Sequence, residues 1–255
     1  MTDIQRSDGR SAGQMRTPEF QRSFTKNAPG SVLVSYGDTR VLCTATYDDK
    51  VPRFRNPEPR RGEPRVPKRG WLTATYAMLP GSTNTRKERD IKNGRIDGRS
   101  SELQRLIGRT LRTAVDFTCV PKMIYVDCDV LQADGGTRTA AISGAWVALH
   151  DMFAHMQQKR EIGDAWPLTR QVGAVSVGVV GDDVLCDLCY SEDAAAQTDL
   201  NLVMTSEGKF IEIQGTAEGD PFSSEQLGAM LEVGGAAIRQ VVEAQNASLG
   251  IQASS

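Results

Sequence analysis

Residues 123–156 read MIYVDCDVLQADGGTRTAAISGAWVALHDMFAHM, and the spacing of the apolar residues changes halfway along this stretch. Between Ile124 and Val130 apolar residues occupy every second position, which predicts a strand with one buried face. After Ile142 they recur every three or four positions, which predicts the buried stripe of a helix. Gly135 and Gly136 separate the two patterns. The stretch therefore predicts a strand that a glycine turn joins to a helix.

The start of this predicted helix is a candidate anion site. The first amides of a helix have no partner inside it and point outward at the positive end of the dipole. The glycines let the backbone come close to an anion, Thr137 adds a hydroxyl, and Arg138 adds a guanidinium fork that suits phosphate. The alternative is a strand-to-helix turn in which the glycines serve geometry only. The Thr-Arg pair favours the anion site but does not identify the anion.

The composition is that of an ordinary soluble globular protein. The chain has 255 residues, of which 39% are hydrophobic and 24% charged, enough for one large domain or two small ones. No apolar run approaches the roughly 20 residues that span a bilayer. Residues 1–25 lack the hydrophobic segment of a secretory signal. We therefore expect a cytoplasmic protein with no membrane segment.

The five cysteines are odd in number, and several lie in strand-like runs, so we expect them to be reduced. Cys186 and Cys189 form a C-x-x-C pair, which could serve zinc or redox chemistry. No second pair has a matching spacing. Buried structural thiols are the favoured interpretation.

Charge is segregated along the chain, although the net charge is only −2. Residues 50–112 contain 17 Lys and Arg against 6 Asp and Glu, a balance of +11. The other residues contain 13 against 26, a balance of −13. A basic segment on an acidic protein indicates that a polyanion is held locally by that segment.

Local patterns predict the remaining elements of the first half. Residues 1–27 are expected to form a polar N-terminal arm with at most a short early strand, and residues 31–47 a hairpin about Gly37-Asp38. A Pro- and Arg-rich exposed loop precedes a strand at 71–78, and a second basic loop follows it, so that both loops can lie at the same end of a sheet. Ser101 and Gln104 form a capping-box pattern that is expected to open a helix.

The second half repeats this order in outline. Two hairpins are predicted, about 181–183 and 207–208. A second capping box, Ser223 with Gln226, is expected to open a last helix. The polar tail at 245–255 is expected to fray.

Asp187, Asp193 and Asp199 follow one another at intervals of six. If strands flank the short loop, Asp193 and Asp199 can converge, and two adjacent carboxylates repel unless a divalent cation or a proton lies between them. The alternative is turn-forming Asp residues, which are common where hairpins end. An anion site, a basic surface and paired carboxylates together suit chemistry at a phosphodiester. A hydrolytic nuclease has no evident use for the second phosphate site, whereas a phosphorolytic enzyme must hold phosphate in line with the scissile bond.

Motifs along nearly the whole chain resemble those of the ribonuclease PH family. In chain order they are RSDGR, GSVLVSYGDTRVLCTA, GWLTATYAMLP, GRSSELQRLIGRTLR, DCDVLQADGGTRTAAISGA, VSVGVV, YSEDAAAQTDLNLVMT and IEIQGTAEGDPFS. The resemblance implies an α+β fold, a single domain over residues 1–255 with two pseudo-repeated strand-and-helix halves. It implies a phosphate-dependent 3′–5′ exoribonuclease that trims transfer RNA precursors and releases nucleoside diphosphates reversibly. It also implies a homohexamer, three dimers in a ring, that uses Mg²⁺ and takes inorganic phosphate as co-substrate.

The resemblance assigns roles to eight residues of this chain. The implied phosphate-binding residues are Arg99, Gly136, Thr137 and Arg138; the implied catalytic and metal-binding residues are Asp193 and Asp199; the implied RNA-binding residues are Arg86 and Arg89. Some relatives in exosome-like rings have lost catalysis, and the retained arginines and aspartates argue against that state here.

Two departures from the family pattern affect RNA binding. Gly81 stands where the family commonly has an arginine. The loop from Arg53 to Arg69 is longer and more basic than usual, and we expect it to supply replacement contacts with RNA or with neighbouring subunits.

Overall fold

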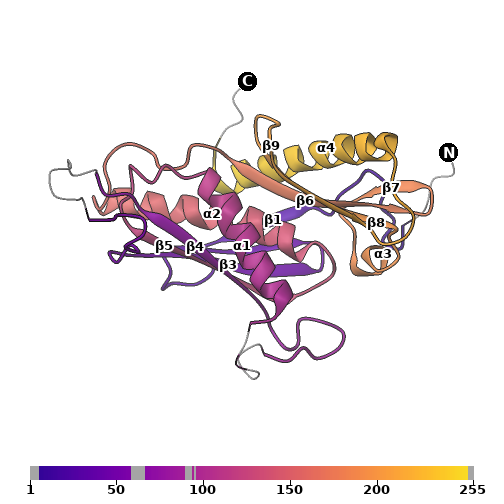
Figure 1. Ribbon diagram of the computed structural model, residues 1–255, viewed down its shortest axis with the longest axis horizontal. Helices are drawn as coiled ribbons and strands as arrows, with labels where there is room; N and C mark the ends of the chain where they lie inside the picture. The colour runs from indigo at the N-terminus through magenta and orange to yellow at the C-terminus, as the bar shows by residue number, and fades with distance from the viewer. Residues whose placement is uncertain (1–5, 59–66, 90–93, 95, 252–255) are drawn as a thin grey trace.

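Two sheets and three long helices make up the computed structural model, which describes residues 6–58, 67–89, 94 and 96–251 (Figure 1). The first sheet contains β1 (Pro18–Arg22), β2 (Gly30–Tyr36), β3 (Thr39–Asp48), β4 (Trp71–Met78) and β5 (Met123–Gln132), in the order β1-β2-β3-β5-β4. The second contains β6 (Val172–Val180), β7 (Asp183–Cys186), β8 (Thr198–Thr205) and β9 (Phe210–Ala217), in the order β7-β6-β8-β9. The helices are α1 (Gly98–Thr113), α2 (Thr137–Gln158), the short α3 (Tyr190–Asp193) and α4 (Ser224–Leu249).

Both sheets are antiparallel except where β4 pairs with β5. Figure 1 shows the first sheet with α1 and α2 at the left and the second sheet with α4 at the right. The architecture is a mixed α+β fold, as the sequence predicted.

Helix α2 lies between the two sheets, where it contacts β2 and β3 of the first and β6 of the second. For this reason it is buried on nearly all sides rather than along one stripe. Gly144 permits the close approach, since a Cβ there would lie 2.5 Å from Val34 Cγ1 and 2.9 Å from Cys43 Sγ. The core is therefore continuous through α2.

Most of the predicted elements are confirmed. The strand at 71–78, the strand and helix that flank Gly135-Gly136, and the hairpins about Gly37-Asp38, 181–183 and 207–208 are all present. Ser223 caps α4, accepting a hydrogen bond from the Gln226 amide, while the Gln226 side chain accepts one from the Ser223 amide. Strand β7 nevertheless stops at Cys186, because Asp187 has a φ of 50° and turns the chain.

The predicted start of α1 was wrong. The helix begins at Gly98, and its N-cap is Asp97, whose Oδ1 accepts a hydrogen bond of 2.5 Å from the Ser100 amide. Lys87 Nζ lies 2.6 Å from Asp97 Oδ2 and, with the Ser100 bond, lowers the pKa of Asp97 to about 2. Ser101 is an exposed residue inside the helix. Consequently Arg99 belongs to the first turn of α1.

The predicted frayed tail was also wrong over residues 245–249. Helix α4 continues to Leu249, and Gln245 is fully buried. The Gln245 side-chain nitrogen, Nε2, donates hydrogen bonds of 3.1 Å to the Ser143 carbonyl and 3.0 Å to the Val172 carbonyl, which join α4 to α2 and β6. Residues 252–255 lie outside the described part of the chain.

The two basic loops do not share one end of the sheet, contrary to the expectation. One precedes β4 and the other follows it, so their bases are separated by the length of an eight-residue strand, about 26 Å. Asn56 and Arg69 close the first loop with two hydrogen bonds of 2.8 Å. Gly81 and the second loop lie at the same end as Gly135, since the Ala133 amide donates to the Ser82 carbonyl. The tip of the first loop, residues 59–66, lies outside the described residues.

All five cysteines are free, and four of them are buried, which agrees with the expected structural thiols. Across the residues with described positions, none of the helices combines the length and apolarity of a membrane span.

Candidate functional site

The turn between β5 and α2 brings together the predicted phosphate-binding residues. Gly135 and Gly136 have φ of 72° and 65°, and Gly136 is the N-cap of α2. A Cβ on Gly135 would lie 2.2 Å from the Leu188 carbonyl oxygen, so glycine is required there to let the chain before α3 approach. That contact explains Gly135 without an anion. The phosphate-binding role of this turn stays a prediction.

Side chains hold the first turn of α2 in place. Thr137 is buried, and its Oγ1 lies 2.7 Å from the Tyr76 hydroxyl. Arg138 is partly buried and donates to Gln214 Oε1 of β9 at 3.2 Å. Gln214 in turn donates to Glu102 of α1 at 2.8 Å. Arg138 therefore connects the first half of the chain to the second, which local sequence patterns could not show.

Asp193 and Asp199 converge, as the sequence predicted. Asp193 is the last residue of α3, and Asp199 lies on β8 between Gly178 of β6 and Thr216 of β9. The two carboxylates are close enough for Asp193 to raise the pKa of Asp199. Asn201 donates a hydrogen bond of 3.1 Å to Asp199 Oδ2, whereas Asp199 Oδ1 is buried with no hydrogen-bond partner among the described residues.

The electrostatics place the cations beside the carboxylates. Burial raises the pKa of Asp199, with Asp193 adding to the rise, while Arg138 and Arg99 oppose it. Asp193 is exposed as a whole residue, yet partial burial of its carboxyl raises its pKa too, again against Arg138 and Arg99. Arg99 of α1 and Arg138 of α2 thus lie close enough to Asp193 of α3 and Asp199 of β8 to influence the charge of both carboxyls.

Arg86 and Arg89, the predicted RNA-binding residues, lie in the exposed segment between β4 and α1. Arg89 lowers the pKa of Asp129, which burial and Asp127 raise, so Arg89 lies near β5. Gly81 is also exposed, and a Cβ added there would meet no atom within 4 Å. All three residues follow the C-terminal end of β4, the end at which Gly135 and the candidate site lie.

The carboxylate pair fits Mg²⁺. This ion is usually bound through one or two protein carboxylates together with waters and substrate phosphates. Asp199 Oδ1, buried and unpartnered, is an oxygen that a hard cation would satisfy. Within the described ranges, no group of three or more His, Cys, Asp or Glu residues is placed to hold a metal ion. Asp193 and Asp199 could therefore hold Mg²⁺ only together with waters or substrate phosphates as its other ligands.

A group of buried ions behind the site escaped the sequence analysis. Arg6, Arg10 and Arg16 of the N-terminal arm are buried and face Asp187 and Glu192. The first and last members are separated by more than 180 residues in the sequence. Only the RSDGR motif near the start hinted at them. The polar N-terminal arm is therefore packed into the fold through these arginines, which its composition alone did not indicate.

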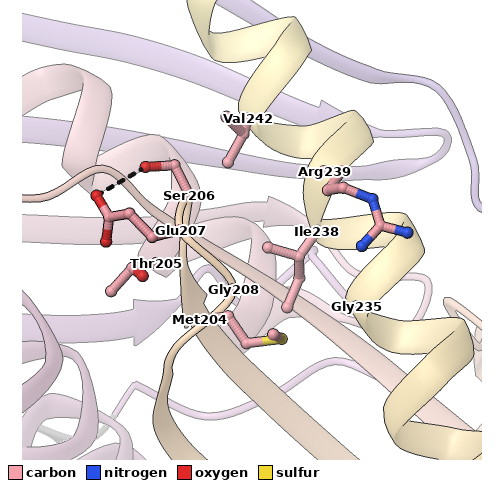
Figure 2. A pocket seen from close by; sticks show the side chains of 9 residues that line it. All are labelled: Met204, Thr205, Ser206, Glu207, Gly208, Gly235, Ile238, Arg239 and Val242. Atoms are coloured by element: carbon pink, nitrogen blue, oxygen red, sulfur yellow. Dashed lines mark hydrogen bonds between the residues drawn. The ribbon is translucent and has the colours of Figure 1, made fainter.

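A separate cavity of about 200 Å³ lies between the β8–β9 turn and α4 (Figure 2). It is lined by residues that include Thr205, Glu207 and Arg239. Thr205 ends β8, whereas Asp199 lies near its start, so this cavity is at the opposite end of the strand from the carboxylate pair.

Comparison with known structures shows the fold in other proteins. An Archaeoglobus fulgidus exosome structure, with RNA bound to its active site, has a chain with a TM-score of 0.77 and 23% identity, over 94% of this chain and 92% of that one. Rice (Oryza sativa) Rrp46 gives a TM-score of 0.71 and 23% identity, over 96% of this chain and all of that one. A chain of an archaeal exosome core gives 0.70 and 22%, over 95% and 91%.

Family models identify the chain more directly. Residues 14–154 match the 3′ exoribonuclease family, domain 1, and residues 170–237 match domain 2 of the same family. Together the matches include β5, α2, α3 and β8, which carry Arg138, Asp193 and Asp199. The chain therefore belongs to the 3′ exoribonuclease family, the ribonuclease PH family.

Proposed function

We propose that this protein is a phosphate-dependent 3′–5′ exoribonuclease that trims the 3′ ends of transfer RNA precursors. One observation carries the proposal: Arg99 and Arg138 act electrostatically on both Asp193 and Asp199, so an anion site and a carboxylate pair share one place. Hydrolysis would need the carboxylates and a cation but no second anion site. Phosphorolysis needs both.

In the proposed reaction, Arg99, Arg138 and the amides near Gly136 and Thr137 hold inorganic phosphate. A phosphate oxygen attacks the phosphorus of the last linkage, and the bond from that phosphorus to the 3′ oxygen of the preceding nucleotide breaks. The products are a nucleoside diphosphate and an RNA with a free 3′ hydroxyl. The phosphoanhydride bond of the diphosphate replaces the phosphodiester bond, and the proton of the attacking phosphate passes to the 3′ oxygen. Because little free energy is lost in this exchange, the reverse addition of nucleotides is expected as well.

Asp193 and Asp199 are the residues that would hold Mg²⁺, which would offset negative charge at the reacting phosphorus. The raised pKa of each carboxyl also suits one of them to hold a proton. Arg99 and Arg138 supply fixed positive charge at the same position, and guanidinium groups bind phosphate oxygens in pairs.

RNA is proposed to enter along the segment that carries Arg86 and Arg89. One subunit presents only a short basic patch, whereas a hexameric ring would gather six copies of it. Such a surface binds the RNA backbone with little reading of the bases. The similarity of the fold to exosome chains supports a ring assembly for this chain.

The decisive experiment incubates the purified protein with Mg²⁺ and a short RNA with a single-stranded 3′ tail, with and without inorganic phosphate. Diphosphates that appear only with phosphate would support phosphorolysis. Arg138→Ala should abolish phosphate use and spare RNA binding. Arg239→Ala serves as the matched control and should behave as the unaltered protein, because Arg239 lines the cavity at the opposite end of β8 from Asp199.

The same experiment tests two other classes. Monophosphates released in phosphate-free buffer would mean hydrolysis. RNA binding without release under any condition would identify a structural subunit of an exosome-like ring, a reading that the exosome origin of two similar structures keeps open.

A further inference from the structure

The buried ion group behind the site is the feature that the proposed function leaves unexplained. The Arg6 side chain is fully buried, the Arg10 and Arg16 side chains are 7% exposed, and the Asp187 side chain is fully buried. Burying charges is costly unless each is paired and hydrogen-bonded.

Arg16 and Asp187 form the centre of this group. Arg16 Nη2 lies 2.7 Å from Asp187 Oδ1, Arg16 Nε lies 2.8 Å from Oδ2, and the Arg16 amide donates to Oδ2 at 2.9 Å. The guanidinium is thus engaged side-on by both carboxylate oxygens, which fixes its plane. Its remaining nitrogen, Nη1, donates at 2.5 Å to the carbonyl of Asp134.

Asp134 is the residue directly before the glycine turn of the phosphate site. The Arg16 guanidinium also borders Gly136, where an added Cβ would lie 3.4 Å from Arg16 Nη2 and 3.5 Å from Asp187 Oδ1. Thr39 supports the same turn, accepting from the Asp134 amide at 2.9 Å and donating to the Gly135 carbonyl at 2.5 Å. One face of the turn therefore rests on the Arg16–Asp187 pair.

The other side of the group reaches the helix that ends in Asp193. Glu192 accepts bonds of 2.7 and 2.5 Å from Arg6 and one of 2.9 Å from the Cys189 amide. The Tyr190 amide donates at 3.1 Å to Asp134 Oδ1, which joins α3 to the turn directly. Arg16 also donates to the Leu188 carbonyl at 3.3 Å. The phosphate turn and α3 are thus held by the same buried ions.

We propose that Arg16 and Asp187 are positioning residues, which set the separation between the glycine turn at 135–136 and the α3 helix that carries Asp193. The inference rests on the proposed function, because that function makes this separation matter: phosphate bound at the turn must lie in line with a bond held beside Asp193. A misplacement of about 1 Å in such a geometry reduces the rate about 100-fold.

The test removes both members of the pair, while Arg10, which also contacts the Asp187 carboxylate, keeps its 2.6 Å ion pair with Asp8. Arg16→Met combined with Asp187→Leu replaces the ions with apolar side chains, a change that often leaves stability intact. The matched control is Arg22→Met with Asp151→Leu. Arg22 also comes from the N-terminal arm, and its Nη2 donates to Asp151 Oδ1 of α2 at 2.6 Å. Asp151 lies 14 residues beyond Thr137, about 21 Å along the helix, so this pair is far from the glycine turn.

Five quantities are measured for each variant: the thermal midpoint, the RNA affinity, the affinity for inorganic phosphate without RNA by calorimetry, and the kcat and KM for phosphate. We expect the Arg16/Asp187 variant to keep its RNA affinity, to bind phosphate more weakly and to lose about 100-fold in kcat/KM for phosphate. The control pair should change neither phosphate quantity. A folded Arg16/Asp187 variant within about twofold of the unaltered protein in both would overturn the inference.

If the double variant does not fold, Arg16→Lys decides the question. Lysine keeps the charge but cannot reproduce the fork that reaches both Asp187 and Asp134. A folded Arg16→Lys protein with unchanged phosphate affinity and kcat would overturn the proposal, and a selective loss of both would support it.

The binding measurement also separates this inference from the proposed function. If the unaltered protein binds inorganic phosphate at a site that Arg138→Ala removes, yet releases no diphosphate, the proposed function fails and the phosphate affinity of the Arg16/Asp187 variant still decides the positioning role. If the unaltered protein binds no phosphate, both fall.

Discussion

Asp187 and Asp199 are equally spaced from Asp193 in the sequence, but their surroundings differ completely. The Asp187 carboxylate is fully buried and accepts bonds from Arg10 and Arg16 at both oxygens. Among the described residues, Asn201 gives Asp199 a hydrogen bond at one oxygen, and the other oxygen is buried without a partner. Within that part of the chain, the hydrogen bonds of the Asp187 carboxylate are therefore satisfied and those of the Asp199 carboxylate are not.

This difference is the one expected between a structural carboxylate and a ligand-binding carboxylate. A buried polar group without a partner costs about 1–3 kcal/mol, so it persists where a ligand completes it. Spacing alone could not make this distinction, because it treats all three aspartates alike. The predictions that follow test whether the complete cluster serves the fold and the incomplete site serves chemistry.

The largest effect is expected at the incomplete site. Asp193→Asn removes one of two anionic oxygen donors while keeping the shape of the side chain, so turnover should fall by about 1,000-fold. The thermal midpoint should hold or rise, because the repulsion with Asp199 is gone. Asp182→Asn, in the β6–β7 turn, is the control for loss of one carboxylate. Near-normal turnover of Asp193→Asn, measured by nucleotide release, would contradict the metal-binding role.

The complete cluster should respond in stability. Arg6→Met removes the guanidinium that lies 2.5 Å from Glu192 and leaves Arg10 at 3.8 Å, and removing one member of a buried ion pair costs about 3–5 kcal/mol. Arg22→Met breaks a more exposed pair and should cost about 1 kcal/mol or less. Urea unfolding measures both free energies. Equal costs for the two variants would erase the contrast between the buried cluster and the surface.

Magnesium affinity should depend on pH above the range of ordinary carboxyl groups. The pKa values of Asp193 and Asp199 are raised in the folded protein, so protons compete with Mg²⁺ at a higher pH than the value near 4 of a free aspartate. Affinity should therefore be full at neutral pH and fall as pH falls through the raised pKa values, up to about tenfold per pH unit for each proton taken up.

Calorimetric Mg²⁺ titrations between neutral pH and about pH 4 check this dependence. Asp193→Asn sharpens the test, since it removes the neighbouring charge that contributes to the raised pKa of Asp199. The remaining dependence should then move to lower pH. Affinity that is flat down to pH 4 would mean that the carboxylates are not the ligands.

The smallest effect is expected on the exposed segment that leads to the site. Arg86→Ala should weaken RNA binding and reduce the slope of log affinity against log salt by about one. Gly81→Arg should do the reverse, because Gly81 is exposed and a side chain there meets no other atom within 4 Å of its Cβ. Identical slopes for both variants and the unaltered protein would place this segment off the RNA path.

Local sequence patterns predicted most of the strands and helices. At the site they predicted the convergence of Asp193 and Asp199 but not the buried ions behind it. The change in apolar spacing at Gly135-Gly136 predicted β5 and α2, and the two predicted hairpins were enough to place Asp193 near Asp199. The same patterns placed Arg6, Arg10 and Arg16 in a polar arm, because their partners Asp187 and Glu192 are more than 170 residues away. Burial of an arginine depends on such partners and leaves no periodic trace.

Two errors had simpler causes. Ser101 and Asp97 are both acceptable caps, and the contact of Lys87 with Asp97 favoured the earlier one. The shared end of the two basic loops could have been rejected from the sequence, since loops that flank one strand emerge at its opposite ends. The number of domains and the roles of the eight assigned residues stay predictions.

The burial of α2 between two sheets has a consequence for the synthesis of the protein. Its last residue, Gln158, leaves the ribosome 87 residues before Gln245, which completes its contacts from α4. At about 5–20 residues per second, the side of α2 that β6 and α4 will cover waits roughly 4–17 s. During that interval α2 has only the first sheet to pack against, and the apolar side that β6 and α4 will cover is exposed to aggregation.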